Sequence, residues 1–144
     1  IDGTMAVACA LWPKERSAKL FRDLEDAKIY VPDHWYVDVA SCLGGLRRIG
    51  RITEDESLEI LAFVSRLIIN TISYKGCMVQ SVPEVIKLAL KLSTPVTKAA
   101  YIHVAQKFKA PLYVCASELR EAAKRAGVEV SDIGSDQSTN LLEF

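Results

Sequence analysis

Residues 110–116 read Ala-Pro-Leu-Tyr-Val-Cys-Ala, an apolar run of strand length that includes a proline near its start. Unbroken apolar runs of this kind are typical of parallel strands that are covered on both faces. The pattern of 117–126 is helical, Gly127 follows as its cap, and 128–130 form another short run that suits a strand. We therefore expect a strand, a helix and a strand in succession, the unit from which α/β domains are built.

The same alternation continues toward the N-terminus. Residues 29–31 are β-branched or aromatic and end at Pro32, which predicts another strand. Between 33 and 49, apolar residues recur every three or four positions, which predicts a helix that buries one face. Thr53 and Glu56 have the spacing of a capping box, so a long helix is expected from there to about residue 68. Further helices are expected at 5–11, 13–26, 81–90 and 96–107, and 78–79 are expected to be extended.

This order of elements predicts a three-layer α/β/α sandwich with a mainly parallel sheet of about four or five strands. Ile1 and Asp2 are expected to end its first strand. We expect residues 1–130 to form a single domain. The tail 131–144 is polar until Leu141 and is expected to be mobile or to dock on a neighbour.

Composition excludes several classes of protein. The chain has 144 residues, of which 50% are hydrophobic, and this apolar fraction excludes wholesale disorder. Eighteen basic residues balance eighteen acidic ones, which argues against a strongly basic nucleic-acid binder. The longest apolar runs are far shorter than the roughly 20 residues that cross a bilayer, and no secretory signal opens the chain. We therefore expect a soluble, cytoplasmic protein with no membrane partner.

Motifs that mark common sites are absent from the sequence. There is no glycine-rich phosphate loop and no G-x-S-x-G nucleophile elbow, so dinucleotide, nucleotide triphosphate and hydrolase functions are disfavoured. The four cysteines form no C-x-x-C pair and lack zinc-finger spacing to a histidine. They are expected to be small buried residues. They are Cys9, Cys42, Cys77 and Cys115.

The expected fold nevertheless predicts where a functional site would lie. In a doubly wound sheet, ligands bind beyond the carboxyl ends of the strands. Residues 2–4 and 115–118 each follow a predicted strand, and the helices that carry Asp38 and Lys98 could begin alongside them. These segments are therefore the candidates for a functional site.

Residues 2–7 read Asp-Gly-Thr-Met-Ala-Val, residues 38–41 read Asp-Val-Ala-Ser, and residues 110–112 read Ala-Pro-Leu. Taken together, these segments resemble PIN domains, and most closely the VapC-type toxins of toxin–antitoxin pairs. Residues 2–7 resemble the D-x-[ST] opening of that family. Residues 31–52 resemble its P…E-V-A-N…L…R-G-R-I helix, with Asp-Val-Ala-Ser at 38–41. Residues 89–105 resemble A-L…V-Y-D-A-x-Y-x-x-L-A, and 110–119 resemble A-P-L-V-T-x-D-x-x-L. The resemblance covers residues 1 to about 130.

The resemblance implies metal-dependent RNA cleavage, in which three or four carboxylates hold Mg²⁺ or Mn²⁺. Asp2 matches the first acid, and Asp38 matches the second, where glutamate is usual. Lys98 stands at the third acid and Ala116 at the fourth. We therefore expect Asp2 and Asp38 to bind metal weakly or not at all. Lys98, the third expected member of the catalytic site, would lie within reach of both aspartates and replace the metal as the neutralising cation.

Neighbouring residues are candidates for binding. The resemblance places Thr4 at the hydroxyl position of the first motif and Ser41 where asparagine is common. Glu118 follows Ala116 by two residues and could supply a substitute acid. The candidate binding residues are Thr4, Ser41, Arg47, Arg48, Ser117 and Glu118, the arginines as contacts to RNA phosphates.

Ordinary structural roles fit the same residues. Asp2 could cap the turn after a strand, and Lys98 could be a solvated helix lysine. Arg47 and Arg48 could simply occupy an exposed helix end, where cations are favourable. Glu118 could be an exposed glutamate in the first turn of a helix.

Three functions therefore remain open. The first is a PIN-like protein with an incomplete metal site and impaired or lost ribonuclease activity. The second is an active Mg²⁺- or Mn²⁺-dependent endoribonuclease of a toxin–antitoxin pair. The third is a module that binds nucleotide or phosphate through Lys98, or that serves assembly. The resemblance also implies a homodimer, an antitoxin protein and RNA as partners.

Overall fold

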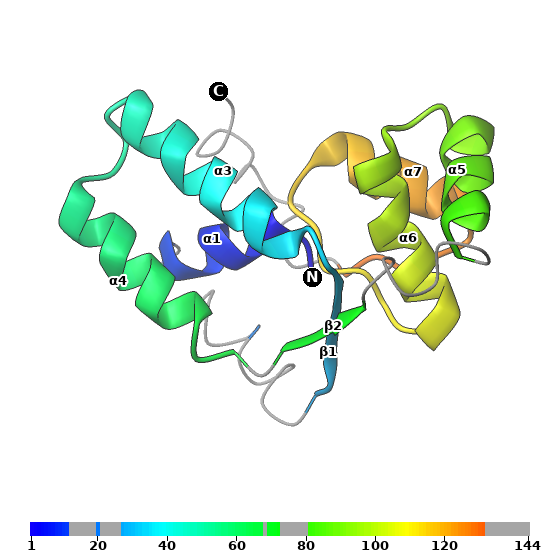
Figure 1. Ribbon diagram of the computed structural model, residues 1–144, viewed down its shortest axis with the longest axis horizontal. Coiled ribbons are helices and arrows are strands. Elements are labelled where there is room, and N and C mark those ends of the chain that lie inside the picture. The colour runs from blue at the N-terminus through cyan, green and yellow to red at the C-terminus, as the bar shows by residue number, and fades with distance from the viewer. Residues whose placement is uncertain (12–19, 21–26, 68, 73–80, 132–144) are drawn as a thin grey trace.

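The computed structural model describes residues 1–11, 20, 27–67, 69–72 and 81–131 (Figure 1). These residues form six helices and two strands. In chain order the elements are α1 (Gly3–Leu11), β1 (Ile29–Pro32), α3 (Trp35–Arg48), α4 (Glu54–Val64), β2 (Ile69–Ile72), α5 (Ser81–Leu92), α6 (Val96–Phe108) and α7 (Ser117–Arg125).

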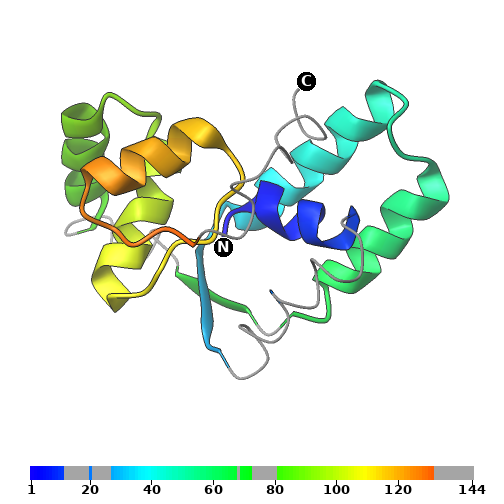
Figure 2. The same cartoon turned by 180° about the vertical axis from the view of Figure 1, so that it is seen from behind.

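The helices form two groups on either side of the strands (Figures 1 and 2). One group contains α1, α3 and α4, and the other contains α5, α6 and α7. α1 packs against α3 and α4, and α6 packs against β1. The N-terminal residue lies close to the place where the two groups meet. The start of α1 is therefore near both groups.

Local signals define α3 and α4 as the sequence predicts. The backbone N–H of Glu56 donates to the Thr53 hydroxyl at 3.2 Å, and the Thr53 N–H donates to the Glu56 carboxylate at 2.7 Å. This reciprocal pair is the predicted capping box. Gly50 follows α3 with φ +71°, a left-handed conformation that glycine adopts without strain. α4 ends at Val64, before the expected residue 68.

The predicted apolar stripe of α3 forms part of the core. Trp35, Val39, Cys42 and Leu46 are all nearly inaccessible to solvent, whereas Ile49, at the end of the stripe, is exposed. The face of α3 that lacks the stripe carries the polar residues discussed below. The periodicity of the sequence therefore predicts correctly which face of this helix packs.

The described cysteines, Cys9, Cys42 and Cys115, are buried, as expected. Burial raises the pKa of Cys9, and it raises the pKa of Cys42 to about 12. Both side chains are therefore protonated at neutral pH and behave as small apolar groups. Cys115 donates a weak hydrogen bond from its sulfur to that of Met5, at 3.6 Å. Cys77 lies outside the described residues.

The predicted sandwich with four or five strands is wrong. The described residues contain one sheet of two strands, β1 and β2, which pair in parallel with Ile29 opposite Ile69. Residues 112–115 and 128–130 were expected to be strands, but they share a single parallel bridge between Leu112 and Val130. Helices make up most of the rest.

The apolar run is buried without becoming a paired strand. Leu112 and Val114 are almost fully inaccessible to solvent. The Leu112 N–H donates to the carbonyl of Glu129 at 2.8 Å, and the Asp2 N–H donates to the carbonyl of Tyr113 at 3.0 Å. These are isolated contacts rather than a ladder. An apolar run reports burial, whereas strand pairing depends on which backbone lies beside it, and the pattern does not contain that information.

The other helix predictions are confirmed where the structure tests them. Those at 5–11, 81–90, 96–107 and 117–126 correspond to α1, α5, α6 and α7. The predicted helix at 13–26, the extended pair at 78–79 and the tail fall outside the described residues, apart from Leu20 and Ser131. Within the described ranges, no helix combines the length and the apolar character that a bilayer span requires.

Candidate functional site

α1 begins at a buried carboxyl group. Asp2 is 4% exposed, and its Oδ1 accepts a hydrogen bond from the Met5 backbone N–H at 2.8 Å, the arrangement of an N-terminal cap. The Thr4 hydroxyl donates to Oδ2 at 2.7 Å. Burial raises the pKa of Asp2, and these two hydrogen bonds oppose the rise. Asp2 therefore caps α1 and also places a carboxyl group inside the molecule.

Gly3 allows α1 to approach α3 closely. A Cβ atom on Gly3 would lie 2.8 Å from the Cβ of Asp38 and 2.9 Å from the backbone nitrogen of Val39. Real Cβ atoms essentially never come this close to other heavy atoms, so a larger residue would force the helices apart. The absence of a side chain at Gly3 therefore brings the second aspartate next to the start of α1.

Asp38 is held by a tyrosine from the other helical group. The Tyr101 hydroxyl on α6 donates to Asp38 Oδ2 at 2.5 Å. Burial raises the pKa of Tyr101, and the bond to Asp38 raises it further. His34 Nε2 lies 3.7 Å from the same carboxylate oxygen. The Asp38 side chain is 37% exposed, so it remains accessible to a ligand while Tyr101 fixes its orientation.

The two aspartates border one cavity of about 250 Å³. It lies where the helical groups meet, because α1 and α3 contribute one side and α6 and α7 the other (Figure 1). The cavity is lined by Asp2, Gly3, Thr4, Asp38, Ser41, Cys42, Thr97, Lys98, Tyr101, Ala116 and Leu119. Six of these are residues or positions that the sequence singles out, from four separate segments: Asp2, Thr4, Asp38, Ser41, Lys98 and Ala116.

Lys98 lines the cavity but forms its ion pair at the rim. Its ammonium donates a hydrogen bond to the carboxylate of Glu118, in the first turn of α7. This hydrogen bond and the positive charge of Lys98 lower the pKa of Glu118. The observed partner of Lys98 is therefore Glu118, rather than the two aspartates expected from the sequence. Ser117 precedes Glu118 at the start of α7 and is not among the lining residues.

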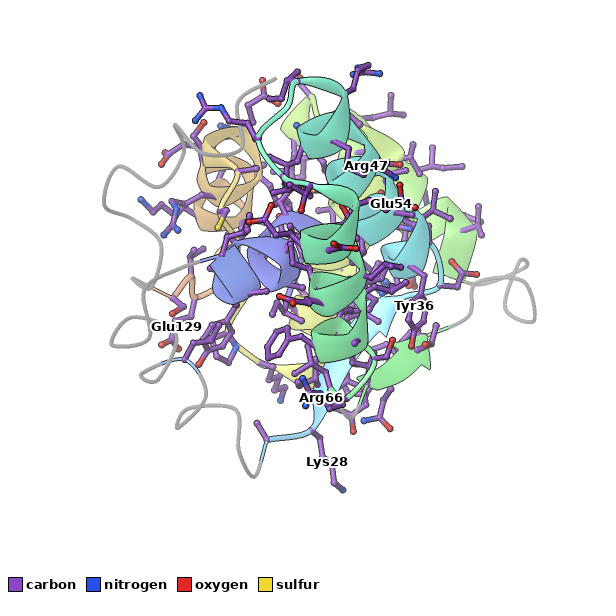
Figure 3. The ribbon with its side chains drawn as sticks, turned by 90° about the vertical axis from the view of Figure 1, so that its left-hand side faces the viewer. Lys28, Tyr36, Arg47, Glu54, Arg66 and Glu129 are labelled. Carbon is purple, nitrogen blue, oxygen red and sulfur yellow. The ribbon has the colours of Figure 1, made fainter. Side chains whose placement is uncertain are left out.

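Arg47 and Arg48 lie at the far end of α3. Arg47 is nine residues beyond Asp38, which corresponds to about 14 Å along a helix. Its guanidinium donates to Glu54 at 3.0 Å, and this surface pair is visible in Figure 3. Arg48 is exposed, and neither arginine lines the cavity. Any contact of these residues with RNA would therefore be outside the cavity.

The N-terminal ends of three helices border the cavity. The first turns of α1, α6 and α7 all contribute to the cavity, through Thr4, through Thr97 and Lys98, and through the residues around Ala116. The N-terminus of a helix carries a partial positive charge from its unpaired N–H groups. Beside these helix ends, the hydroxyls of Thr4 and Tyr101 each donate a hydrogen bond to one of the two aspartates.

The donor set does not fit a resident magnesium or manganese ion. A magnesium ion takes six oxygen ligands, and where a protein offers only one or two carboxylates, waters and the phosphates of a bound substrate supply the others. Only Asp2 and Asp38 offer carboxylates among the residues that line the cavity. Both oxygens of Asp2 already accept internal hydrogen bonds, and the described residues contain no cluster of three or more acidic, histidine or cysteine side chains suited to a metal. We therefore derive no reaction step through a metal.

Sequence patterns miss two polar members of the site. Tyr101 fixes Asp38, and Thr97 lines the cavity. A signal for Tyr101 was present, because it lies three residues after Lys98 and so shares a helix face with it. Its hydroxyl reaches Asp38 only because of where α6 lies relative to α3, which the sequence pattern does not report.

Comparison with known proteins adds no family to this geometry. No protein-family model matches the chain, and no curated protein matches its sequence. The arguments about function that follow therefore depend on the cavity and its side chains.

Proposed function

We propose that this chain is a PIN-like protein of the VapC type whose metal site is reduced to two carboxylates, with impaired or lost metal-dependent ribonuclease activity. One observation supports this most directly. The side chains at the resemblance positions, which come from four segments far apart in the sequence, line one cavity. This proposal is based on the site and not on the fold, because the described residues lack the expected sheet of four or five strands.

The chemistry of the cavity supports loss of activity over retention. Cleavage of a phosphodiester by this family requires a cation that activates water and neutralises charge on the phosphate. Asp2 and Asp38 would repel a phosphate, and the ammonium of Lys98 is already paired with Glu118. The cavity therefore favours a binding or assembly role over catalysis.

An active endoribonuclease is the second candidate, and one observation favours it. Glu118 lies at the rim of the cavity, one hydrogen bond from Lys98, so a third carboxylate is close at hand. With Mg²⁺ or Mn²⁺ bound, Asp2, Asp38 and Glu118 would form the acidic set. Binding of a nucleotide or phosphate through Lys98 is less favoured, because the anion would have to displace Glu118 beside two further carboxylates.

The partners and location follow from the same proposal. We propose a homodimer, an antitoxin protein and RNA as the partners, and the cytoplasm as the location. A membrane partner is not part of this proposal.

Manganese titration tests the proposed function. We expect the melting temperature of the chain to stay constant as Mn²⁺ is added, and RNA to remain uncut. A ligand at 100 times its dissociation constant stabilises by about 2.7 kcal/mol, a rise on the order of 8 °C for a chain of this size. A saturable rise that Asp2→Asn abolishes and Glu59→Gln, an exposed control on α4, retains would overturn the proposal in favour of an active nuclease.

A further inference from the structure

A second cavity, of about 240 Å³, lies between β1 and α6. It is lined by residues of both elements and by the segment 110–113, which follows α6. Tyr101 is the one described residue that this cavity shares with the lining of the candidate site. The two cavities are therefore neighbours with different linings.

The inner part of this second cavity is apolar. Val104, Ala105 and Leu112 border it, and each is 6% exposed or less. The lining also includes Lys28 and Pro111, which are exposed to solvent. The cavity therefore has an apolar interior and a mouth that opens to water.

Aromatic rings form much of the wall. Four of the residues that border the cavity are aromatic: Tyr30, Tyr101, Phe108 and Tyr113. The rings of Tyr30 and Phe108 stack between β1 and α6, with centroids 3.9 Å apart and planes at 8° to each other. Aromatic rings prefer to meet other rings in offset-stacked or edge-to-face arrangements. The wall therefore favours an occupant that contains an aromatic ring.

The volume restricts the size of the occupant. An apolar cavity of about 150 Å³ is large enough to bind benzene, whereas sites for drug-sized ligands usually exceed about 300 Å³. A cavity of about 240 Å³ lies between these limits. It suits a molecule with one aromatic ring and a short substituent.

Lys28 determines the charge that the mouth favours. Its side chain is the only charged one among the described residues that line the cavity, and it projects from the surface of the molecule in Figure 3. An anionic group at the mouth would be attracted to this ammonium, and a cationic group would be repelled by it. Charge complementarity therefore favours an acid over an amine.

We propose that this cavity binds a small aromatic carboxylic acid, with its ring in the interior and its carboxylate at the mouth beside Lys28. The inference does not depend on the proposed reduced metal site, because neither Asp2 nor Asp38 lines this cavity. Tyr101 connects the two cavities, since its ring borders this one and its hydroxyl donates to Asp38.

Titrations followed by NMR compare three ligands of similar size on the parent chain. 3-Phenylpropionate has both the ring and the negative charge, 3-cyclohexylpropionate keeps the charge without the aromatic ring, and 3-phenylpropylamine keeps the ring with the opposite charge. We expect 3-phenylpropionate to bind saturably, with a dissociation constant of about 1 mM or lower. It should bind about threefold more tightly than either of the other two ligands.

Two pairs of variants locate the ligand. Ala105→Leu fills the interior and should weaken binding by about tenfold, whereas Ala62→Leu, at an exposed position of α4, should bind as the parent does. Lys28→Glu reverses the charge at the mouth and should abolish the preference for the acid over the amine. Lys87→Glu, at an exposed position of α5, should retain that preference. Circular dichroism checks that each variant folds, and Ala110→Leu, at a less buried position of the lining, replaces Ala105→Leu if that variant does not.

Four results would overturn the inference. The first is the absence of saturable binding of 3-phenylpropionate to the parent, and the second is tighter binding of 3-cyclohexylpropionate, which would assign the cavity to a saturated chain. The third is unchanged binding to the variant with the filled interior, which would place the ligand elsewhere. The fourth is a preference for the acid that survives Lys28→Glu. None of these results bears on the proposed function, which the manganese titration tests separately.

Discussion

At the scale of single residues, Gly3 sets how closely α1 approaches α3. We expect Gly3→Ala to lower the free energy of unfolding by about 1–3 kcal/mol, because its Cβ would overlap the backbone of α3. Gly44, inside α3, has no atom within 4 Å of a built Cβ, so Gly44→Ala should raise stability by about 0.5–1 kcal/mol through helix propensity. Urea unfolding measures both. If Gly3→Ala were as stabilising as Gly44→Ala, the close approach would carry no energetic weight.

The Tyr101 hydroxyl is a second determinant at this scale. Tyr101→Phe removes the bond to Asp38 and should cost about 1 kcal/mol, because the half-exposed carboxylate can accept water instead. Tyr36→Phe is the control, since this tyrosine on α3 is more than half exposed and points outward (Figure 3). Equal unfolding free energies for the two variants, compared by urea titration, would contradict the structural role of Tyr101.

The sequence predicts some residues of the site and not others. A residue that matches a motif can be identified from the sequence, whereas a residue whose role depends on its partner in space cannot. Asp2 and Asp38 stand out because they match two acidic positions of the motifs that the chain resembles, and both border the cavity. The partner of Lys98 could not be predicted, since the choice between Glu118 and an aspartate depends on where α7 begins relative to α6. Arg47 has a suitable charge, but helix geometry places it too far along α3.

At the scale of elements, the capping box shows how a local pattern fixes the start of a helix. Thr53→Ala should lower the free energy of unfolding by about 1 kcal/mol at pH 7, because α4 loses its cap. Hydrogen bonds from Thr53 lower the pKa of Glu56 below its ordinary value of 4.5. The folded chain therefore holds the Glu56 proton less tightly than the unfolded chain, so this contribution to stability is present above that value and is lost as the pH falls through the lowered one.

The variant Glu56→Gln isolates the pH-dependent part of the capping box's contribution to stability. The variant should be less stable than the parent at pH 7, and the two should converge as the pH approaches 3. Glu59→Gln, on the same helix but outside the capping box, is the matched control. Thermal unfolding from pH 3 to pH 7 checks this, and a difference that stayed constant with pH would contradict the assigned role of the carboxylate.

The sequence of a helix contains the local signals that predict it, whereas the sequence of a strand does not show which segment it pairs with. The cap of α4 and the stripe of α3 are local, so both are predictable from a short window of sequence. The run at 112–115 has the composition of a buried strand, yet it meets 128–130 at one bridge. Strand pairing requires a distant backbone in register, and a window of seven residues cannot report that.

At the scale of the whole molecule, the buried apolar residues that the structure describes fall into two clusters. The main cluster draws on α1, β1, α3, α4, α6 and α7, with Leu92 from the end of α5. The smaller one joins α5 to α6 through Val85, Ala89, Ala99 and Ala100. The cavity lies where the two helical groups meet, so its shape depends on α6 and α7 staying packed on the main cluster. α5 contributes little to that packing.

This division predicts that α5 opens before the rest of the chain unfolds, because little apolar area holds it. In native-state hydrogen exchange, α5 amides should show a lower opening free energy than those of α3. Val39→Ala, in the main cluster, should lower protection in α3 by about 2 kcal/mol and leave α5 unchanged, since its contacts persist when α5 opens. Val85→Ala should lower the protection of amides in both α5 and α3, because the contacts of Val85 are broken when α5 opens alone and also when the whole chain unfolds. If Val39→Ala accelerated exchange in α5 as much as in α3, the chain would unfold as one cooperative unit.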